Sequence, residues 1–133
     1  MKEEKKLLVM GDRGIVREIF IRKGRLCVII EMVWECNPAR TFMEGAMSSR
    51  NYHNGYVQTL NKNKNKGYDR FIDKIKTDEL TFSGELIGFS KDISFFGFDS
   101  AHVWNDHVPK SKTFEEVKKR TIKMCDEMVR KGI

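Results

Sequence analysis

The chain has 133 residues and a net charge of +6, and 40% of its residues are hydrophobic and 33% charged. That length fits one domain, residues 1–133, whose core needs no metal or disulfide for support. No apolar run approaches the roughly 18 residues that a membrane span requires, and the start lacks the apolar stretch of a signal peptide. The composition therefore excludes a membrane partner and favours a cytoplasmic protein.

The first third of the chain contains an ambiguous pattern and a clear strand. Residues 1–10 form a charged lead-in, expected to be frayed or to make a first helical turn, and residues 11–14 are expected to form a turn. The apolar residues within 15–21 fit either a helical face or a strand. Apolar side chains occupy both faces of residues 26–34, which predicts a central strand covered on both sides and entered through a turn at residues 23–24.

The middle of the chain alternates short elements with long connections. Residues 37–54 are expected to hold a short helix or a loop that covers a ligand, because connections this long are uncommon without structure or function. Residues 61–67 indicate a mobile, basic loop, and residues 68–75 a short helix. Two further strands are predicted, at residues 55–60 and at residues 80–83 with an extension over 86–89.

The last segment carries the clearest helical pattern. Thr113 followed by Glu116 predicts a capping box, in which the threonine hydroxyl accepts from the third amide and the glutamate reaches back. Apolar residues then recur at helical spacing opposite a charged face, and Gly132 is placed to end the helix. We therefore predict an α+β fold, a single domain with a mostly antiparallel sheet packed against a C-terminal amphipathic helix.

The three cysteines, Cys27, Cys36 and Cys125, are an odd number without CxxC spacing. This pattern argues against a disulfide framework or a zinc ribbon. Cys27 falls in an apolar run and Cys125 on the apolar side of the helical pattern. Both are predicted to be ordinary core residues, because a free cysteine packs as a small hydrophobe.

An aromatic run that ends beside titratable residues marks the candidate site. Residues 93–98 are typical of a buried strand, and Gly97 within them suggests a bulge or the close approach of another backbone. A strand that ends in this way delivers polar side chains to the rim of its sheet. The residues expected there are Asp99, His102, Trp104, Asp106 and His107.

These polar residues leave three interpretations open. Two imidazoles and two carboxylates within nine positions could bind a divalent metal, with Asp99, His102 and His107 as candidate ligands. Alternatively, Asp99, His102 and Asp106 could act as catalytic acids and bases, because an aspartate can orient a histidine toward a substrate. In the third interpretation Asp99 caps the turn after the strand and His102 satisfies buried backbone. No cofactor other than such a metal is implied.

Aromatic and basic residues extend the candidate ligand-binding set. Tyr56 and Trp104 could stack on a planar base or pack at a domain edge, and His53 and Lys110 are further candidates. Basic residues concentrate in the loop at 61–67 and in the last segment of the chain. They form either a solvated surface or a positive field around a site for phosphate-bearing ligands.

Four sequence blocks follow one another between residue 26 and the end of the chain. They are Leu26-Cys27-Val28-Ile29-Ile30, Gly55-Tyr56-Val57, Leu80-Thr81-Phe82-Ser83 and Phe96-Gly97-Phe98-Asp99-Ser100-Ala101-His102. In these blocks the chain resembles a family of small, mostly uncharacterised proteins of bacteriophages and prophages, whose last block is aromatic-Gly-Phe-Asp-Cys-Ala-His-x-x-Asp. The family has cysteines where this chain has Asn54 and Ser100, and His-Gly-Gly at residues 77–79. In the family block two residues separate the histidine from the aspartate, whereas three residues separate His102 from Asp106 in this chain.

The resemblance implies a viral protein that acts in the cytoplasm of the host cell, and it implies no established reaction. Our first hypothesis is a binding protein that captures a small anionic, nucleotide-like ligand such as a host immune signal. The alternatives are a hydrolase or lyase that uses Asp99, His102 and Asp106, and an interaction module for a host protein or nucleic acid. A homo-oligomer is expected, since closed homo-oligomers are common.

Overall fold

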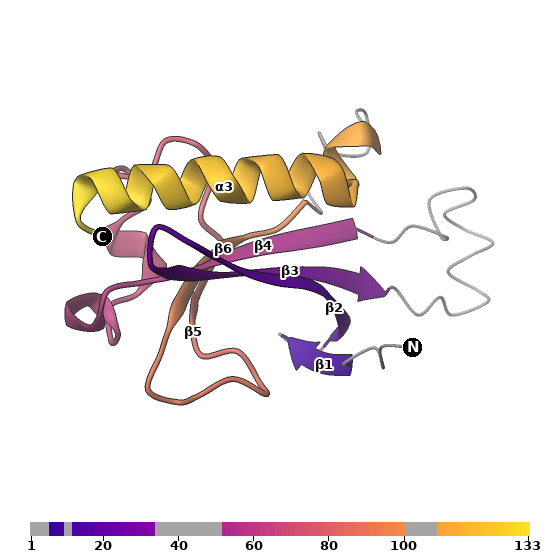
Figure 1. The fold of residues 1–133 in the computed structure, drawn as a ribbon, viewed down its shortest axis with the longest axis horizontal. Helices are drawn as coiled ribbons and strands as arrows, with labels where there is room; N and C mark the ends of the chain where they lie inside the picture. Colours follow the sequence, from indigo (N-terminus) through magenta and orange to yellow (C-terminus); the bar gives the residue numbers. More distant parts are fainter. Residues whose placement is uncertain (1–5, 10–11, 34–51, 101–108) are drawn as a thin grey trace.

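In the described part of the chain, six strands form one sheet and an α-helix lies along one face of it (Figure 1). The computed structural model describes residues 6–9, 12–33, 52–100 and 109–133. The elements are β1 (Lys6–Val9), β2 (Asp12–Arg22), β3 (Arg25–Val33), β4 (Tyr52–Gln58), β5 (Phe82–Gly84), β6 (Phe95–Phe98) and the helix α3 (Phe114–Lys131). The strand order is β1-β2-β3-β4-β6-β5, and every neighbouring pair is antiparallel. The predicted α+β fold is confirmed.

The strand β3 lies inside the sheet and is covered on both faces, as predicted. Cys27 and Ile29 pack on the face that carries α3, whereas Val28, Ile30 and Met32 pack on the opposite face. None of these side chains is more than 2% exposed. Because successive side chains of a strand point to opposite faces, two separate cores form around this one strand.

The helix-side core lies between α3 and the sheet. Val117, Met124, Cys125 and Met128 of α3 are all fully buried. Their spacing places them on one stripe of the helix, so the apolar face that the sequence predicts is the one that contacts the sheet. Burying each valine or methionine stabilises the fold by about 1.5–3 kcal/mol relative to leaving it exposed.

The far core, on the face away from α3, is covered by the irregular segment 85–93 (Figure 1). Leu86 is only 2% exposed, and the ring of Phe89 packs edge-on against Phe95 with 5.6 Å between the ring centroids. The predicted strand extension over residues 86–89 is wrong, because the Phe89 N–H donates to the Leu86 carbonyl at 3.1 Å and closes a turn. The far core therefore has a lid without regular secondary structure.

The turn between β2 and β3 forms where the sequence predicts it. Lys23 and Gly24 have φ angles of 50° and 78°, and Arg22 pairs with Arg25 across them. Two residues with positive φ give a turn whose twist matches that of the flanking strands. Since this hairpin offers a partner to residues 15–21, the ambiguous segment is a strand.

The beginning of the chain differs from the predicted lead-in and turn. Residues 6–9 form β1, which pairs with residues 12–15 at the start of β2. Residues 12–14 are therefore strand, and the prediction of a turn over 11–14 is wrong for them. The pairing with β1 supplies partners for their backbone, which local turn preferences do not take into account.

Both ends of α3 form close to the prediction. The Glu116 N–H donates to Thr113 Oγ1 at 3.3 Å, and Gly132, with a φ of 67°, caps the other end. The Thr113 N–H donates to the Lys110 carbonyl at 3.2 Å, which replaces the predicted return contact from the Glu116 side chain. Only the forward half of the capping box is therefore formed.

The predicted short helix over residues 68–75 is wrong. Tyr68–Arg70 make a 3₁₀ helix, η3, after which the chain turns. The Tyr68 N–H donates to Ser83 Oγ at 3.0 Å, and the Glu127 carboxylate accepts the N–H groups of the two residues that follow Ile75. Side chains distant in sequence thus hold this backbone in a compact turn.

The remaining predictions have mixed outcomes. The strands expected near residues 55–60, 80–83 and 93–98 are β4, β5 and β6 with shifted ends. The basic loop 61–67 begins with a 3₁₀ helix, η2 (Asn61–Asn63), in which Asn63 is only 3% exposed. The element expected within residues 37–54 falls largely in 34–51, outside the described residues.

Two of the three cysteines are core residues, as predicted. Cys27 and Cys125 are both fully buried between β3 and α3, whereas Cys36 lies outside the described residues. A hydrogen bond with the Cys125 thiol, together with burial, raises the pKa of Cys27. Within the described ranges, no helix combines the length and the apolar character needed to cross a membrane.

Candidate functional site

The predicted site residues divide into two groups. One group lies within residues 101–108, outside the described residues, so that its arrangement stays a prediction: His102, Trp104, Asp106 and His107. The other group is placed by the structure: His53, Tyr56, Asp99 and Lys110.

His53 and Tyr56 lie on opposite faces of the sheet. His53 faces the helix side, where its Nδ1 lies 2.7 Å from the Lys112 carbonyl oxygen and its ring meets Phe114 edge-on. Tyr56 belongs to the far core and is 1% exposed. Lys110 is exposed in the 3₁₀ helix η4 (Pro109–Lys112). The sheet thus separates His53 from Tyr56, and one small ligand does not contact both.

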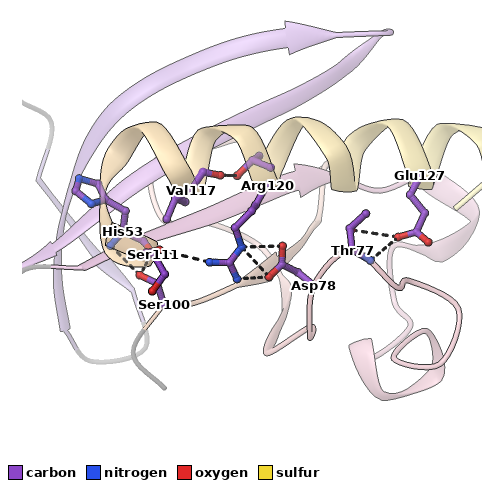
Figure 2. Close-up of polar contacts among 9 residues, drawn as sticks. His53, Thr77, Asp78, Ser100, Ser111, Val117, Arg120 and Glu127 are labelled. Carbon is purple, nitrogen blue, oxygen red and sulfur yellow. Dashed lines mark hydrogen bonds and ion pairs between the residues drawn. The ribbon is translucent and has the colours of Figure 1, made fainter. Parts of the chain in front are cut away.

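Ser100 ties the end of β6 to β4 (Figure 2). Its hydroxyl donates to the His53 carbonyl at 2.6 Å and accepts from the His53 N–H at 3.2 Å. The residue is fully buried. A side chain therefore continues the strand pairing past Phe98, and the structure assigns Ser100 a supporting role at the place where the sequence marks the candidate site.

Replacing Ser100 with alanine is expected to lower the free energy of unfolding by about 1–2 kcal/mol, because it leaves the half-buried N–H and carbonyl of His53 without this partner. Urea denaturation followed by circular dichroism measures the change. Ser100→Cys is the matched variant, since a thiol keeps a weak donor and acceptor, and it should fall between wild type and alanine. An alanine variant as stable as wild type would show that the clamp contributes nothing.

A buried polar group lies on the far face of β4. Asn54 is 5% exposed, and its Nδ2 donates to the Tyr56 hydroxyl at 3.1 Å. The Asn54 Oδ1 has no hydrogen-bond partner among the described residues. Turning the amide over would exchange the two atoms and leave Nδ2 without a partner instead. Either way, one buried polar atom of Asn54 has no hydrogen-bond partner within the described ranges.

Tyr56 is a hydrogen-bonding group and not a base. Burial raises its pKa well above the usual value, and the nearby Tyr52 and Asp99 side chains act in the same direction, against the hydrogen bond from Asn54. The phenol therefore stays protonated at neutral pH. The buried pair of Asn54 and Tyr56 can orient a polar group but does not supply a phenolate nucleophile.

A basic hollow lies at the opposite end of β4. It has a volume of about 530 Å³ and is lined by residues of η2, of the turn after η3 and of the C-terminal end of α3. Figure 1 shows this end of α3 beside the segment that follows β4. The lining residues are Lys62, Asn63, Lys66, Phe71, Asp73, Lys74, Lys131, Gly132 and Ile133.

The charges of the basic hollow are mostly positive. Lys131 Nζ donates to the Glu127 carboxylate at 2.8 Å and to the Lys74 carbonyl, so its position is fixed. Lys62 and Lys66 make no ion pair with any described residue. Four lysines and one aspartate line the hollow, and its field therefore favours an anion.

A second hollow, of about 460 Å³, lies beside the middle of α3. Its arginine, Arg120, donates through Nε to both Asp78 carboxylate oxygens at 3.1 Å and through Nη1 to the Ser111 carbonyl at 3.4 Å (Figure 2). The guanidinium also lies 4.9 Å from the centroid of the Phe98 ring. Because its charge is matched by Asp78, this arginine holds α3 against the sheet.

The structure does not test the metal site suggested by the sequence. Two of its three candidate ligands, His102 and His107, lie outside the described residues, and only Asp99 is placed. Within the described ranges, no cluster of three or more His, Cys, Asp or Glu side chains could hold a metal ion.

Sequence reasoning identified the basic loop but not the full hollow. Lys62 and Lys66 belong to the predicted loop, whereas Lys74 and Lys131 were not singled out. No local signal joins Lys74 to Lys131, because only the packing of α3 brings them together. No protein-family model matches the chain, and no curated protein or solved structure was found to be similar to it.

Proposed function

We propose that the chain is a small binding protein of phage type, without catalytic activity, that captures an anionic, phosphate-bearing ligand. The observation that carries the proposal is the basic hollow, where Lys62, Lys66, Lys74 and Lys131 surround a space of about 530 Å³. Sites for small molecules have volumes of about 300–1,000 Å³, and the volume of the basic hollow falls within this range. The hollow is therefore large enough for a ligand of nucleotide size.

The charges in the hollow favour phosphate. Hydrogen bonds between ammonium groups and phosphate oxygens are about twice as strong as neutral ones. Glu127 neutralises Lys131, and the other opposing charges are the Asp73 carboxylate and the C-terminal end of α3, which carries a partial negative charge of about one half. The ammonium groups of Lys62, Lys66 and Lys74 outweigh these two. Lys131 offers a preordered hydrogen-bond donor, while Lys62 and Lys66 are exposed and can close on a ligand.

A nucleotide is the ligand class that this proposal favours. The resemblance to phage proteins adds a role, the capture of a nucleotide that signals infection inside the host cell. Capture needs a binding site but no catalytic group, and the protonated Tyr56 and the charge-matched Arg120 are consistent with that. Hydrolysis of the same ligands would support an enzyme instead.

The experiment measures thermal stabilisation by pyrophosphate, adenosine monophosphate and a cyclic dinucleotide. At 100 times its dissociation constant, a ligand that binds only the native state adds about 2.7 kcal/mol of stability, which raises Tm by on the order of 5–10 °C. We expect Lys62→Glu/Lys66→Glu to abolish the rise. The matched control, Lys119→Glu/Lys123→Glu, changes the same charge at exposed positions of α3 away from the hollow and should keep it.

The analysis of each incubated sample by mass spectrometry completes the experiment. Intact ligand recovered after heating supports capture, whereas cleaved ligand supports a hydrolase or lyase. The proposal fails if none of the three probes raises Tm, or if the control pair weakens binding as much as the pair in the hollow. The second result would indicate that the anionic ligand is attracted to the positive charge of the whole protein and not to the hollow.

A further inference from the structure

Among the described residues, none pairs with the outer edge of β2 over its second half. β1 pairs only with residues 12–15, and β3 occupies the other edge of β2. No described strand pairs with the outer edge of residues 17–22. On this edge Ile19 is 46% exposed and Ile21 is 74% exposed. An apolar edge strand without a partner is a template for pairing with another chain.

The backbone of Ile19 and Ile21 points outward from the sheet. The Leu26 N–H donates to the Gln58 side chain at 3.0 Å and is therefore directed from β3 toward β4. Neighbouring residues of a strand alternate in direction, so Arg25 is directed toward β2 and forms the closing pair of the hairpin with Arg22. The same alternation along β2 turns the N–H and carbonyl groups of Ile19 and Ile21 away from β3.

We propose that a second copy of the chain pairs with this edge, with the two β2 strands antiparallel and the symmetry axis at Phe20. Ile19 then lies opposite Ile21 of the partner subunit, and symmetry creates this pair twice. In each pair the outward N–H and carbonyl groups of one strand face those of the other and can form hydrogen bonds. Glu18 lies opposite Arg22 of the partner subunit. The contact is self-complementary, as a two-fold interface must be.

The pattern of side chains selects this register. Moving the axis to Ile21 would place Ile19 opposite Lys23 of the partner subunit, and moving it to Ile19 would place Ile21 opposite Arg17 of the partner subunit. Only the axis at Phe20 joins apolar side chains on one face and opposite charges on the other. Cross-strand pairs of both kinds are favourable.

The two residues that form the new charge contact, Glu18 and Arg22, each have an ion-pair partner within their own chain. Glu18 binds Lys118 at 2.8 Å and Arg22 binds Asp126 at 2.7 Å. The new contact between Glu18 and Arg22 therefore joins two ion pairs into a network of alternating sign. At the ends of the contact, Arg17 faces Lys23 of the partner subunit; Arg17 pairs with Glu31, whereas Lys23 shares Asp126 with Arg22, so this contact between like charges is only partly compensated.

Sedimentation equilibrium of the whole chain tests the proposal. We expect a monomer–dimer equilibrium in wild type and a dissociation constant at least about tenfold higher in Ile21→Lys. Ile87→Lys is the matched control, since Ile87 is 60% exposed but lies outside β2, and it should dimerise like wild type. Circular dichroism verifies that each variant is folded.

A charge exchange tests the register. Glu18→Arg alone should weaken the dimer by placing arginine opposite arginine. The double exchange Glu18→Arg/Arg22→Glu should restore it when Lys118→Glu and Asp126→Lys are added, because these two changes preserve the ion pairs within each chain. Wild type that stays monomeric at 100 times the concentration used for the ligand assays would overturn the proposal. Equal effects of Ile21→Lys and Ile87→Lys would also overturn it, and failure of this combined exchange to restore pairing would overturn the register.

Discussion

Replacing Gly55 with alanine is expected to lower the free energy of unfolding by about 3 kcal/mol, the upper part of the usual range for overpacking a core. A Cβ atom at this position would lie 2.0 Å from Thr121 Oγ1 and 2.7 Å from Phe98 Cε1. Neither group can move easily, because Thr121 Oγ1 donates to the Val117 carbonyl at 2.7 Å and Phe98 is 1% exposed. Urea denaturation followed by circular dichroism gives the value.

Two further variants separate this contact from a general effect of alanine. A Cβ at Gly67 would meet only the exposed Asp69 side chain, so Gly67→Ala should change stability by less than about 0.5 kcal/mol. Adding Thr121→Ala to Gly55→Ala removes the closest atom and should recover part of the loss, which makes the two changes non-additive. If Gly55→Ala and Gly67→Ala cost the same, α3 does not approach β4 as closely as described.

Lowering the pH from 4.5 to 2 is expected to remove up to about 3 kcal/mol of stability through Glu127 alone. Burial opposes ionisation of this carboxyl, but Lys131 and the N–H groups of Lys76 and Thr77 outweigh it and lower its pKa from 4.5 to about 2. Because the pKa is lower in the folded than in the unfolded chain, the stabilisation is complete above about pH 4.5 and declines as the pH falls through this window.

Glu127→Gln is the variant that isolates this effect. An amide cannot accept all the hydrogen bonds that the carboxylate accepts, so the variant should be less stable than wild type at pH 7 and should depend less on pH between 4.5 and 2. Asp126, whose pKa the hydrogen bond from Arg22 lowers to about 2, titrates in the same window and leaves a residual slope. Parallel pH profiles of wild type and Glu127→Gln would contradict the assignment to Glu127.

Local signals in the sequence predict the elements that depend on local interactions. The forward cap at Thr113, the terminator Gly132 and the turn at Lys23 and Gly24 all form where their residue types require them. The helix predicted over residues 68–75 does not form, because Ser83 and Glu127, which are distant in sequence, hold the backbone of this region. Such contacts exist only after α3 has packed, and no window of sequence contains them.

The candidate site is less predictable for the same reason. The separation of His53 from Tyr56 depends on β4 beginning at Tyr52, three residues before the predicted strand, because residues three apart in a strand point to opposite faces. The basic hollow was not, since it joins Lys74 to Lys131 through the packing of α3. The polar residues after Asp99 remain a prediction, as they lie outside the described residues.

The two cores have different covers, so we expect the free energy of local opening to differ between the two faces of the sheet. Detaching α3 would expose its buried stripe and break the Glu127 and Arg120 contacts together. Detaching residues 85–93 would expose Leu86 and the side chains that it covers on the far side of the sheet, among them Val28, Ile30 and Phe95. Because residues 85–93 form no helix or strand, we expect this cover to open more readily than α3 and to admit solvent to the far side of the sheet.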